Sequence, residues 1–183
     1  YLTFGAQGTN GTPDPIPDPD YPNDMLAVYW YPQYLPETPE DGGVFCYYDA
    51  ADDRFIVEWK DVRRSKTRKG SYTFQAILYP DGRIVYQYLD IRFESNLYAK
   101  RGTIGIENAT GTDGLKVLHN KAGYVHDGLA IEFVPFYWLE VEPGEATLQP
   151  GESIDLDVTF DLGMTGSGVR EGAVILNTND IRK

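Results

Sequence analysis

The sequence is poor in the residues on which much enzyme and metal chemistry depends. Of its 183 residues, one is a cysteine and two are histidines. A single cysteine excludes an internal disulfide and a zinc site built from cysteines. Because Cys46 stands inside the apolar run from Val44 to Tyr48, we expect it to be a small buried hydrophobic residue. The cysteine count does not decide the compartment.

The two histidines give little support for catalysis. His119 and His126 lie in residues 118–128, which the sequence predicts to be turn-rich and solvated. Their spacing does not fit a helical zinc pair, and the sequence has no Gly-x-Ser-x-Gly elbow for a hydrolase nucleophile. Glu58 and Glu107 are a conceivable glycosidase pair, but 28 acidic residues make such a pair expected by chance. A polysaccharide or peptide hydrolase is therefore the third-ranked function, and we predict a non-catalytic protein.

Positive charge is also scarce, with 16 basic against 28 acidic residues and a formal net charge of −12. A negative field repels phosphate backbones, so we predict no nucleic-acid partner. No apolar run is long enough to cross a bilayer, so we predict no membrane insertion. Any export signal is expected upstream of this sequence.

Calcium is the one cofactor that this composition suggests, because it prefers carboxylate and carbonyl oxygens. Three aspartates, Asp49, Asp52 and Asp53, crowd one turn, and four more lie in the amino-terminal segment, at Asp14, Asp18, Asp20 and Asp24. Neither set matches a twelve-residue EF-hand loop. Aspartates at turns also bond to backbone N–H groups, so both interpretations remain open.

Tyrosine, glycine and proline are plentiful, as expected for short strands joined by tight turns. Residues 72–78 alternate in the period of two that a half-buried strand requires, and Asp81-Gly82 predicts a hairpin turn after them. No comparable segment shows a helical period. The sequence predicts an all-β protein, an antiparallel β-sandwich, with strands at 26–31, 43–49, 54–62, 72–79, 83–89, 103–107, 129–134, 139–142, 146–148, 154–160 and 172–177.

Three regions are predicted along the chain. Residues 1–24 form an irregular segment rich in proline and aspartate, which we expect to lie over the surface, and residues 25–135 form the β-sandwich. Residues 136–183 form part of an immunoglobulin-like domain, truncated because a whole one needs about 100 residues. We expect residues 154–160 and 172–177 to pack against the first domain or a neighbouring chain.

Five separated blocks carry a family resemblance. They are YLTFG at 1–5, PNDMLAVYW at 22–30, RFIVEWKDV at 54–62, YTFQAILYPDG at 72–82 and GIENATG at 105–111. Their order resembles the nidogen-like extracellular β-domain of large secreted bacterial proteins, often attached to subtilisin-like proteases, over roughly residues 1–134. The resemblance implies a secreted or cell-surface location and no catalytic residue.

A second resemblance begins at residue 138. Residues 138–153, WLEVEPGEATLQPGES, with VTFD at 158–161 and LNTND at 176–180, resemble Ig-like repeats of the ASH or BACON type. Such repeats occur in bacterial surface proteins and in microtubule- and cilium-associated proteins. The match covers the first half of the repeat.

Two clusters are candidate ligand-binding residues. The aromatic set Tyr29, Trp30, Tyr31 and Tyr34 would stack on sugars or anchor a protein if exposed, and would fill the core if buried. The basic set Arg63, Arg64, Lys66, Arg68 and Lys69 stands in one hairpin, where it either keeps the loop soluble or docks an acidic polymer or another domain of the same chain.

We therefore expect an adhesion or accessory module of a secreted or cell-surface multidomain protein, binding an extracellular protein or glycan through loops. The alternative is a structural spacer without a ligand, attached to a secreted protease.

Overall fold

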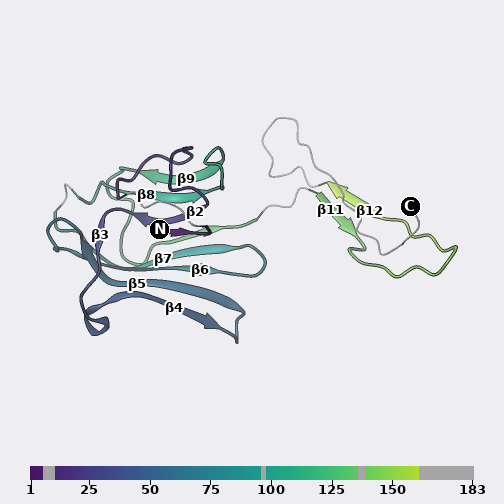
Figure 1. The fold of residues 1–183 in the computed structure, drawn as a ribbon, viewed down its shortest axis with the longest axis horizontal. Coiled ribbons are helices and arrows are strands. Elements are labelled where there is room, and N and C mark those ends of the chain that lie inside the picture. The colour runs from purple at the N-terminus through teal and green to yellow at the C-terminus, as the bar shows by residue number, and fades with distance from the viewer. Residues whose placement is uncertain (6–10, 96–97, 136–138, 161–183) are drawn as a thin grey trace. The chain divides into compact units, whose positions relative to one another are not determined.

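The structure is a computed structural model that describes residues 1–5, 11–95, 98–135 and 139–160 (Figure 1). It divides the chain into two compact units, residues 1–134 and 135–183. The strands within the described residues are β1 (Leu2–Thr3), β2 (Met25–Trp30), β3 (Gln33–Tyr34), β4 (Gly43–Asp49), β5 (Arg54–Arg64), β6 (Ser71–Leu78), β7 (Ile84–Arg92), β8 (Thr103–Glu107), β9 (Gly114–His119), β10 (Ala130–Phe133), β11 (Leu139–Glu142) and β12 (Asp157–Phe160), with one 3-10 turn, η1 (Pro39–Asp41).

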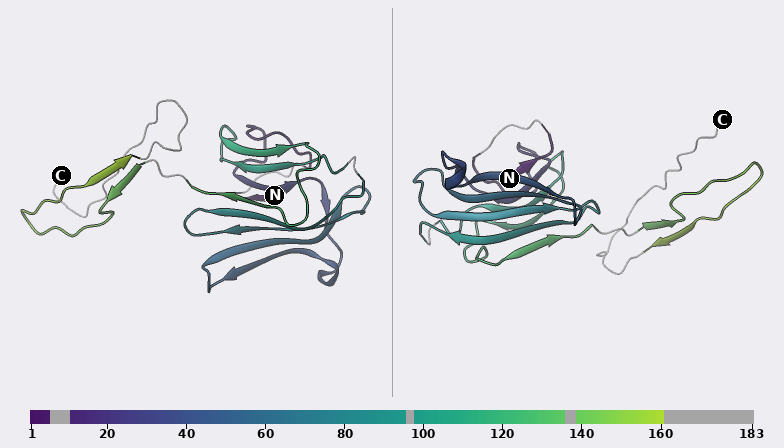
Figure 2. Two further views of the ribbon diagram at one scale, coloured as in Figure 1. Left: turned by 180° about the vertical axis from the view of Figure 1, so that it is seen from behind. Right: turned by 90° about the horizontal axis from the view of Figure 1, so that it is seen from below.

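The first unit consists of two antiparallel sheets. One has the strand order β1-β2-β8-β9, and the other has the order β10-β7-β6-β5-β3, with β4 also paired to β5. Figures 1 and 2 show the two sheets as separate layers. The prediction of an all-β, antiparallel sandwich is confirmed.

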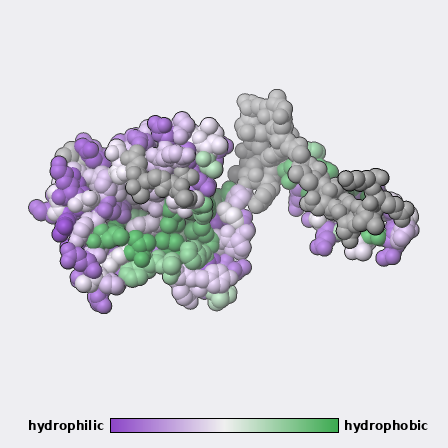
Figure 3. All heavy atoms as spheres, in the orientation of Figure 1, coloured by the Kyte–Doolittle hydropathy of each residue, from purple (hydrophilic) through white to green (hydrophobic). Residues whose placement is uncertain are grey.

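The main core lies between the two layers. Tyr72, Phe74 and Ala76 of β6 face it, as their alternation predicted, and Leu26 and Ile104 meet them from the other sheet. Figure 3 shows apolar side chains gathered across the middle of this unit, with hydrophilic residues around them.

Buried tyrosines also tie the layers together by hydrogen bonds. The Tyr86 hydroxyl donates to the carbonyl of Gly105 at 3.0 Å, and the Tyr88 hydroxyl donates to the carbonyl of Val28. Each bond satisfies a buried hydroxyl that would otherwise destabilise the core. The abundance of tyrosine thus has a structural use, because its ring fills the core while its hydroxyl reaches the opposite sheet.

Strand β2 is buried on both faces, which explains why its sequence shows no alternation. Leu26 and Val28 belong to the main core, whereas Met25 and Trp30 pack with Ile16 in a second cluster on the outer face. The irregular amino-terminal segment, which was predicted to lie over the surface, covers this sheet. It also contributes to the core, because Ile16 is fully buried in the second cluster.

The amino-terminal segment and the loop before β9 approach each other closely. Gly111 has φ +64°, and a Cβ at this position would lie 2.2 Å from the carbonyl oxygen of Asp18. Only glycine allows this contact without displacing the backbone. In the same place the Asp18 amide donates to Glu107 Oε1 at 2.6 Å, while Glu107 Oε2 is buried without a hydrogen-bond partner among the described residues.

This buried carboxyl predicts a dependence of stability on pH. Glu107 is 7% exposed, and burial raises its pKa above the ordinary 4.5. The folded protein then holds the proton more tightly than the unfolded chain, so stability is lost as the pH rises from about 4.5 through the folded pKa. We expect Glu107→Gln, which removes the ionisation, to be more stable than the wild type at pH 8.

Thermal unfolding between pH 4 and pH 8 measures this difference, which should shrink toward pH 4. Glu58→Gln, which changes a partly exposed carboxylate on β5, is the control and should show no such trend. A pH-independent difference, or a less stable Glu107→Gln at pH 8, would contradict the prediction.

Cys46 is exposed, and the prediction that it is buried was wrong. It lies in the middle of β4, which pairs with β5 at one edge of the larger sheet. No β4 side chain belongs to either core cluster. An apolar run predicts burial only where another layer covers the strand, and none of the described residues does so here.

Several other differences concern short strands. The sequence missed β1, β3 and β9, and the stretch predicted to be turn-rich from residue 118 begins inside β9. A register shift in the pairing of β9 with β8, between Ile104 and Gly105, breaks the alternation that would have marked it.

The second unit has a described two-stranded antiparallel sheet, in which Leu139 pairs with Phe160. Strand β11 has its predicted bounds, β12 is shorter than predicted, and residues 146–148 form no strand, contrary to prediction. The predicted strand at 172–177 lies outside the described residues. The packing expected for 154–160 and 172–177 stays a prediction.

Candidate functional site

Two of the four candidate aromatic residues lie inside the protein. Tyr29 packs edge-on against Tyr72 and Phe74, and Trp30 is 3% exposed with its ring edge-on to Tyr1. A ligand cannot stack on either ring, so a direct binding role for Tyr29 and Trp30 is corrected to core packing. Of the two alternatives that the sequence left open, burial in the core holds for Tyr29 and Trp30, because β2 is covered on both faces.

The other two aromatic residues are partly exposed and meet the basic hairpin. Strand β3 pairs with the end of β5, so that Gln33 lies opposite Arg64 and Tyr34 lies opposite Arg63. The partly exposed members of the aromatic set therefore lie beside the basic set, from which they are separate in sequence, at one edge of the larger sheet.

Each of these tyrosines contacts an arginine of the hairpin. Arg64 Nε donates to the Tyr31 hydroxyl at 3.0 Å, and the Arg68 guanidinium lies 4.2 Å from the centre of the Tyr34 ring. Cation–π contacts of this kind hold an arginine over an aromatic face. These two contacts with arginines of the hairpin fix the positions of Tyr31 and Tyr34.

Arg64 differs from the rest of the basic set because it is buried. Besides Tyr31, it pairs with Glu94 at 3.3 Å and stacks 3.7 Å from the centre of the Tyr98 ring. The hydrogen bond with Tyr31 and the nearby Glu94 carboxylate raise the pKa of Arg64. The remaining members are exposed: Arg63, Lys66, Arg68 and Lys69.

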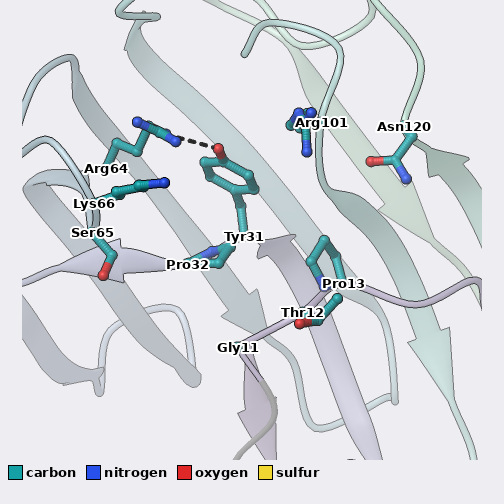
Figure 4. A pocket seen from close by; sticks show the side chains of 10 residues that line it. All are labelled: Gly11, Thr12, Pro13, Tyr31, Pro32, Arg64, Ser65, Lys66, Arg101 and Asn120. Carbon is teal, nitrogen blue, oxygen red and sulfur yellow. Dashed lines mark hydrogen bonds between the residues drawn. The ribbon is translucent and has the colours of Figure 1, made fainter.

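A pocket of about 340 Å³ opens where these segments meet, and we call it the basic pocket (Figure 4). Three cationic side chains line it, Arg64, Lys66 and Arg101. Lys66 and Arg101 are exposed, and neither makes an ion pair within the described residues. Its full lining is Gly11, Thr12, Pro13, Tyr31, Pro32, Arg64, Ser65, Lys66, Arg101 and Asn120.

Sequence reasoning missed Arg101 and Asn120. They stand in loops before β8 and after β9. Two hydrogen bonds join these loops: the Gly102 backbone N–H donates to Asn120 Oδ1 at 3.0 Å, and the Asn120 backbone N–H donates to the Gly102 carbonyl at 2.8 Å. No motif marks either residue. The pairing of β8 with β9 brings their two loops together, and the packing of the two sheets places those loops beside the hairpin.

The pocket has a charge opposite to that of the whole protein. No aspartate or glutamate lines it, although the chain carries a formal net charge of −12. Lys66 and Arg101 offer hydrogen-bond donors, and Tyr31 offers part of an aromatic face, whereas the Asn120 side chain already bonds to the Gly102 amide and to His119 Nε2. This arrangement suits a ligand that carries carboxylate or sulfate groups.

The predicted calcium turn is held by a cation of the protein itself. Arg54 bonds to Asp49 at 2.8 Å and to Asp52 at 3.0 Å, and the Tyr48 hydroxyl donates to Asp53. The hydrogen bond from Arg54 lowers the pKa of Asp49. Across the ranges that the structure describes, no three His, Cys, Asp or Glu side chains are placed to share a metal ion. Calcium binding at Asp49, Asp52 and Asp53 stays a prediction.

The candidate catalytic residues do not come together. His119 ends β9, where its Nδ1 lies 2.8 Å from Thr103 Oγ1, so the prediction of a solvated loop histidine was wrong for it, whereas His126 is exposed. Glu107 lies opposite Met25 under the amino-terminal segment, and Glu58 belongs to the other sheet.

Comparison with known proteins supplies the family. A family model described as NIDO related matches residues 1–126. Neither the curated proteins nor the solved structures gave a match. No helix among the described residues is long and apolar enough to cross a membrane. Because the match spans most of the chain and agrees with the nidogen-like resemblance, the chain belongs to the NIDO-related family.

Proposed function

We propose that this chain is a non-catalytic accessory module of a secreted or cell-surface protein, and that it binds an acidic glycan in the basic pocket. The observation that carries the proposal is that Lys66 and Arg101, beside the Glu94-paired Arg64, line one opening that no carboxylate lines. Membership of the NIDO-related family supports an extracellular setting.

The dimensions and chemistry of the pocket support a sugar ligand. Its volume, about 340 Å³, lies at the lower end of the range for small-molecule sites, which suits one or two sugar units. A uronate or sulfate group would bond to Lys66 and Arg101, while the exposed part of Tyr31 would contact the sugar ring. Arg64 would contribute little net charge, because its guanidinium is already paired with Glu94; held by Tyr31, Thr67 and Glu94, it fixes one wall of the pocket.

Isothermal titration with polygalacturonate, heparin and neutral dextran tests this function. We expect saturable binding of at least one acidic glycan, tighter than about 100 μM, and none of dextran. Arg101→Ala and Lys66→Ala should each weaken binding by about 5- to 10-fold, since each removes a charge-assisted bond worth about 1 to 1.5 kcal/mol.

Lys100→Ala is the matched control, because Lys100 is the exposed neighbour of Arg101 and does not line the pocket. It should bind as the wild type does. An equal loss in Lys100→Ala would indicate non-specific attraction, and no binding of any acidic glycan would favour the spacer alternative. Either outcome would reject the proposed site.

A further inference from the structure

One edge of the larger sheet is open at β4. Within the described residues β4 pairs only with β5, in continuous register from Gly43 opposite Lys60 to Asp49 opposite Arg54. The unpaired edge of a strand offers backbone N–H and C=O groups to another chain. Proteins usually protect such an edge with proline, lysine or a bulge, and β4 has none of these devices.

The side chains of β4 are unusually apolar for an exposed strand. Val44, Phe45, Tyr47 and Tyr48 are all exposed, and Tyr47 is exposed to 64%. Together with Cys46 they form five consecutive uncharged residues. These residues are exposed on both faces of the strand, and none of them belongs to a core cluster. An exposed apolar surface of this kind marks an interaction site.

The order of these residues is suited to self-pairing. Cys46 is the central residue of the seven in β4. If two copies of β4 pair antiparallel about a two-fold axis at Cys46, Phe45 lies opposite Tyr47 of the second copy. Val44 likewise lies opposite Tyr48 of the second copy. Aromatic pairs and pairs of an aromatic with a β-branched residue are the stabilising combinations across antiparallel strands.

We propose that β4 is a homodimerisation edge at which a second copy of this chain continues the larger sheet. A two-fold interface presents the same patch on both subunits, which β4 satisfies through its own sequence. Backbone hydrogen bonds would supply affinity, and the side-chain pairs would supply register.

The charge at the strand ends permits this approach. In the proposed register Asp49 lies opposite Gly43 of the second copy, and Arg54 already pairs with both Asp49 and Asp52. The net charge of −12 on each copy still opposes association, so the dimer should strengthen as salt is added from low ionic strength. The proposal is independent of the basic pocket, because no β4 residue lines that pocket.

Sedimentation velocity of the whole chain over a wide concentration range tests the proposal. We expect a monomer–dimer equilibrium, weakened at least tenfold by Tyr47→Lys, which places a charge on the exposed edge. The matched control is Leu89→Lys, because Leu89 on β7 is 73% exposed and lies away from the edge. It should dimerise as the wild type does. Circular dichroism checks that both variants are folded.

Oxidation at Cys46 tests the register. Opposed residues in an antiparallel pair have Cα atoms about 4.5 or 5.5 Å apart, within the range that a disulfide spans. With copper as catalyst, dioxygen should oxidise the two thiols to one disulfide, giving a covalent dimer much faster in the wild type than in Tyr47→Lys. A monomer at all concentrations, equal weakening by Leu89→Lys, or equally fast crosslinking of Tyr47→Lys would each overturn the proposal.

Discussion

Replacement of Trp30 by alanine is expected to lower the free energy of unfolding of the first unit by about 3–5 kcal/mol. Trp30 is 3% exposed and packs with Ile16 and Met25 under the amino-terminal segment. Its removal leaves a large cavity between β2 and that segment, because the neighbouring backbone is held in the sheet and cannot collapse into the space. The segment should then detach more easily.

Urea denaturation of Trp30→Ala and Tyr34→Ala measures the effect. Tyr34 is a partly exposed aromatic residue on β3, so its truncation should cost much less than that of Trp30. Limited proteolysis should also cut residues 11–24 faster in Trp30→Ala than in the wild type. Unchanged stability combined with lost glycan binding would return Trp30 to the binding site and contradict the assignment made here.

Arg64→Ala is expected to destabilise the protein by about 1–2 kcal/mol, whereas Arg63→Ala should change stability by less than about 0.5 kcal/mol. The two residues are adjacent, but Arg64 is buried and Arg63 is exposed. Removing the Arg64 guanidinium leaves the Glu94 carboxylate without its ion pair and the Tyr31 hydroxyl without its donor. The Thr67 hydroxyl still donates to Glu94 Oε2, so the cost comes from the lost charge partner, the lost donor to Tyr31 and the lost contact with the Tyr98 ring.

Chemical denaturation of the two variants gives the comparison directly. Glu94→Gln separates charge from packing, because it keeps a hydrogen-bond acceptor for Arg64 and should cost less than Arg64→Ala. Equal, small effects of Arg63→Ala and Arg64→Ala would show that the buried contacts of Arg64 add nothing to stability. Arg63→Ala should also leave binding of acidic glycans unchanged, since Arg63 does not line the pocket.

The strands of the larger sheet were predictable because their inner and outer faces differ. In β6 the inward residues Tyr72, Phe74 and Ala76 alternate with Thr73 and Gln75, and the hairpin turn at Asp81-Gly82 follows. Strand β4 has its predicted bounds, yet the burial of Cys46 was predicted wrongly. Sequence pattern identifies a strand, but the position of that strand within the sheet decides whether its side chains are covered.

The candidate site was predictable only in part. The sequence drew attention to the aromatic and basic clusters, because such residues are conspicuous on an acidic chain. It could not tell that Trp30 is buried and Tyr31 partly exposed, or that Arg64 is buried and Arg63 exposed. Adjacent residues differ in exposure because they face different sides, and the residues that cover one side come from distant parts of the chain. Arg101 and Asn120 carried no local signal at all.

The sequence by itself determined the all-β class, most strands of the larger sheet and the nidogen-like family, because these depend on local alternation, turn residues and the order of short blocks. Only the tertiary structure decided which aromatic residues are core, that Arg64 is held by Tyr31 and Glu94, and that a basic pocket and an open β4 edge exist. Those features depend on contacts between residues far apart in the chain, which strand pairing and layer packing establish and which no local pattern encodes.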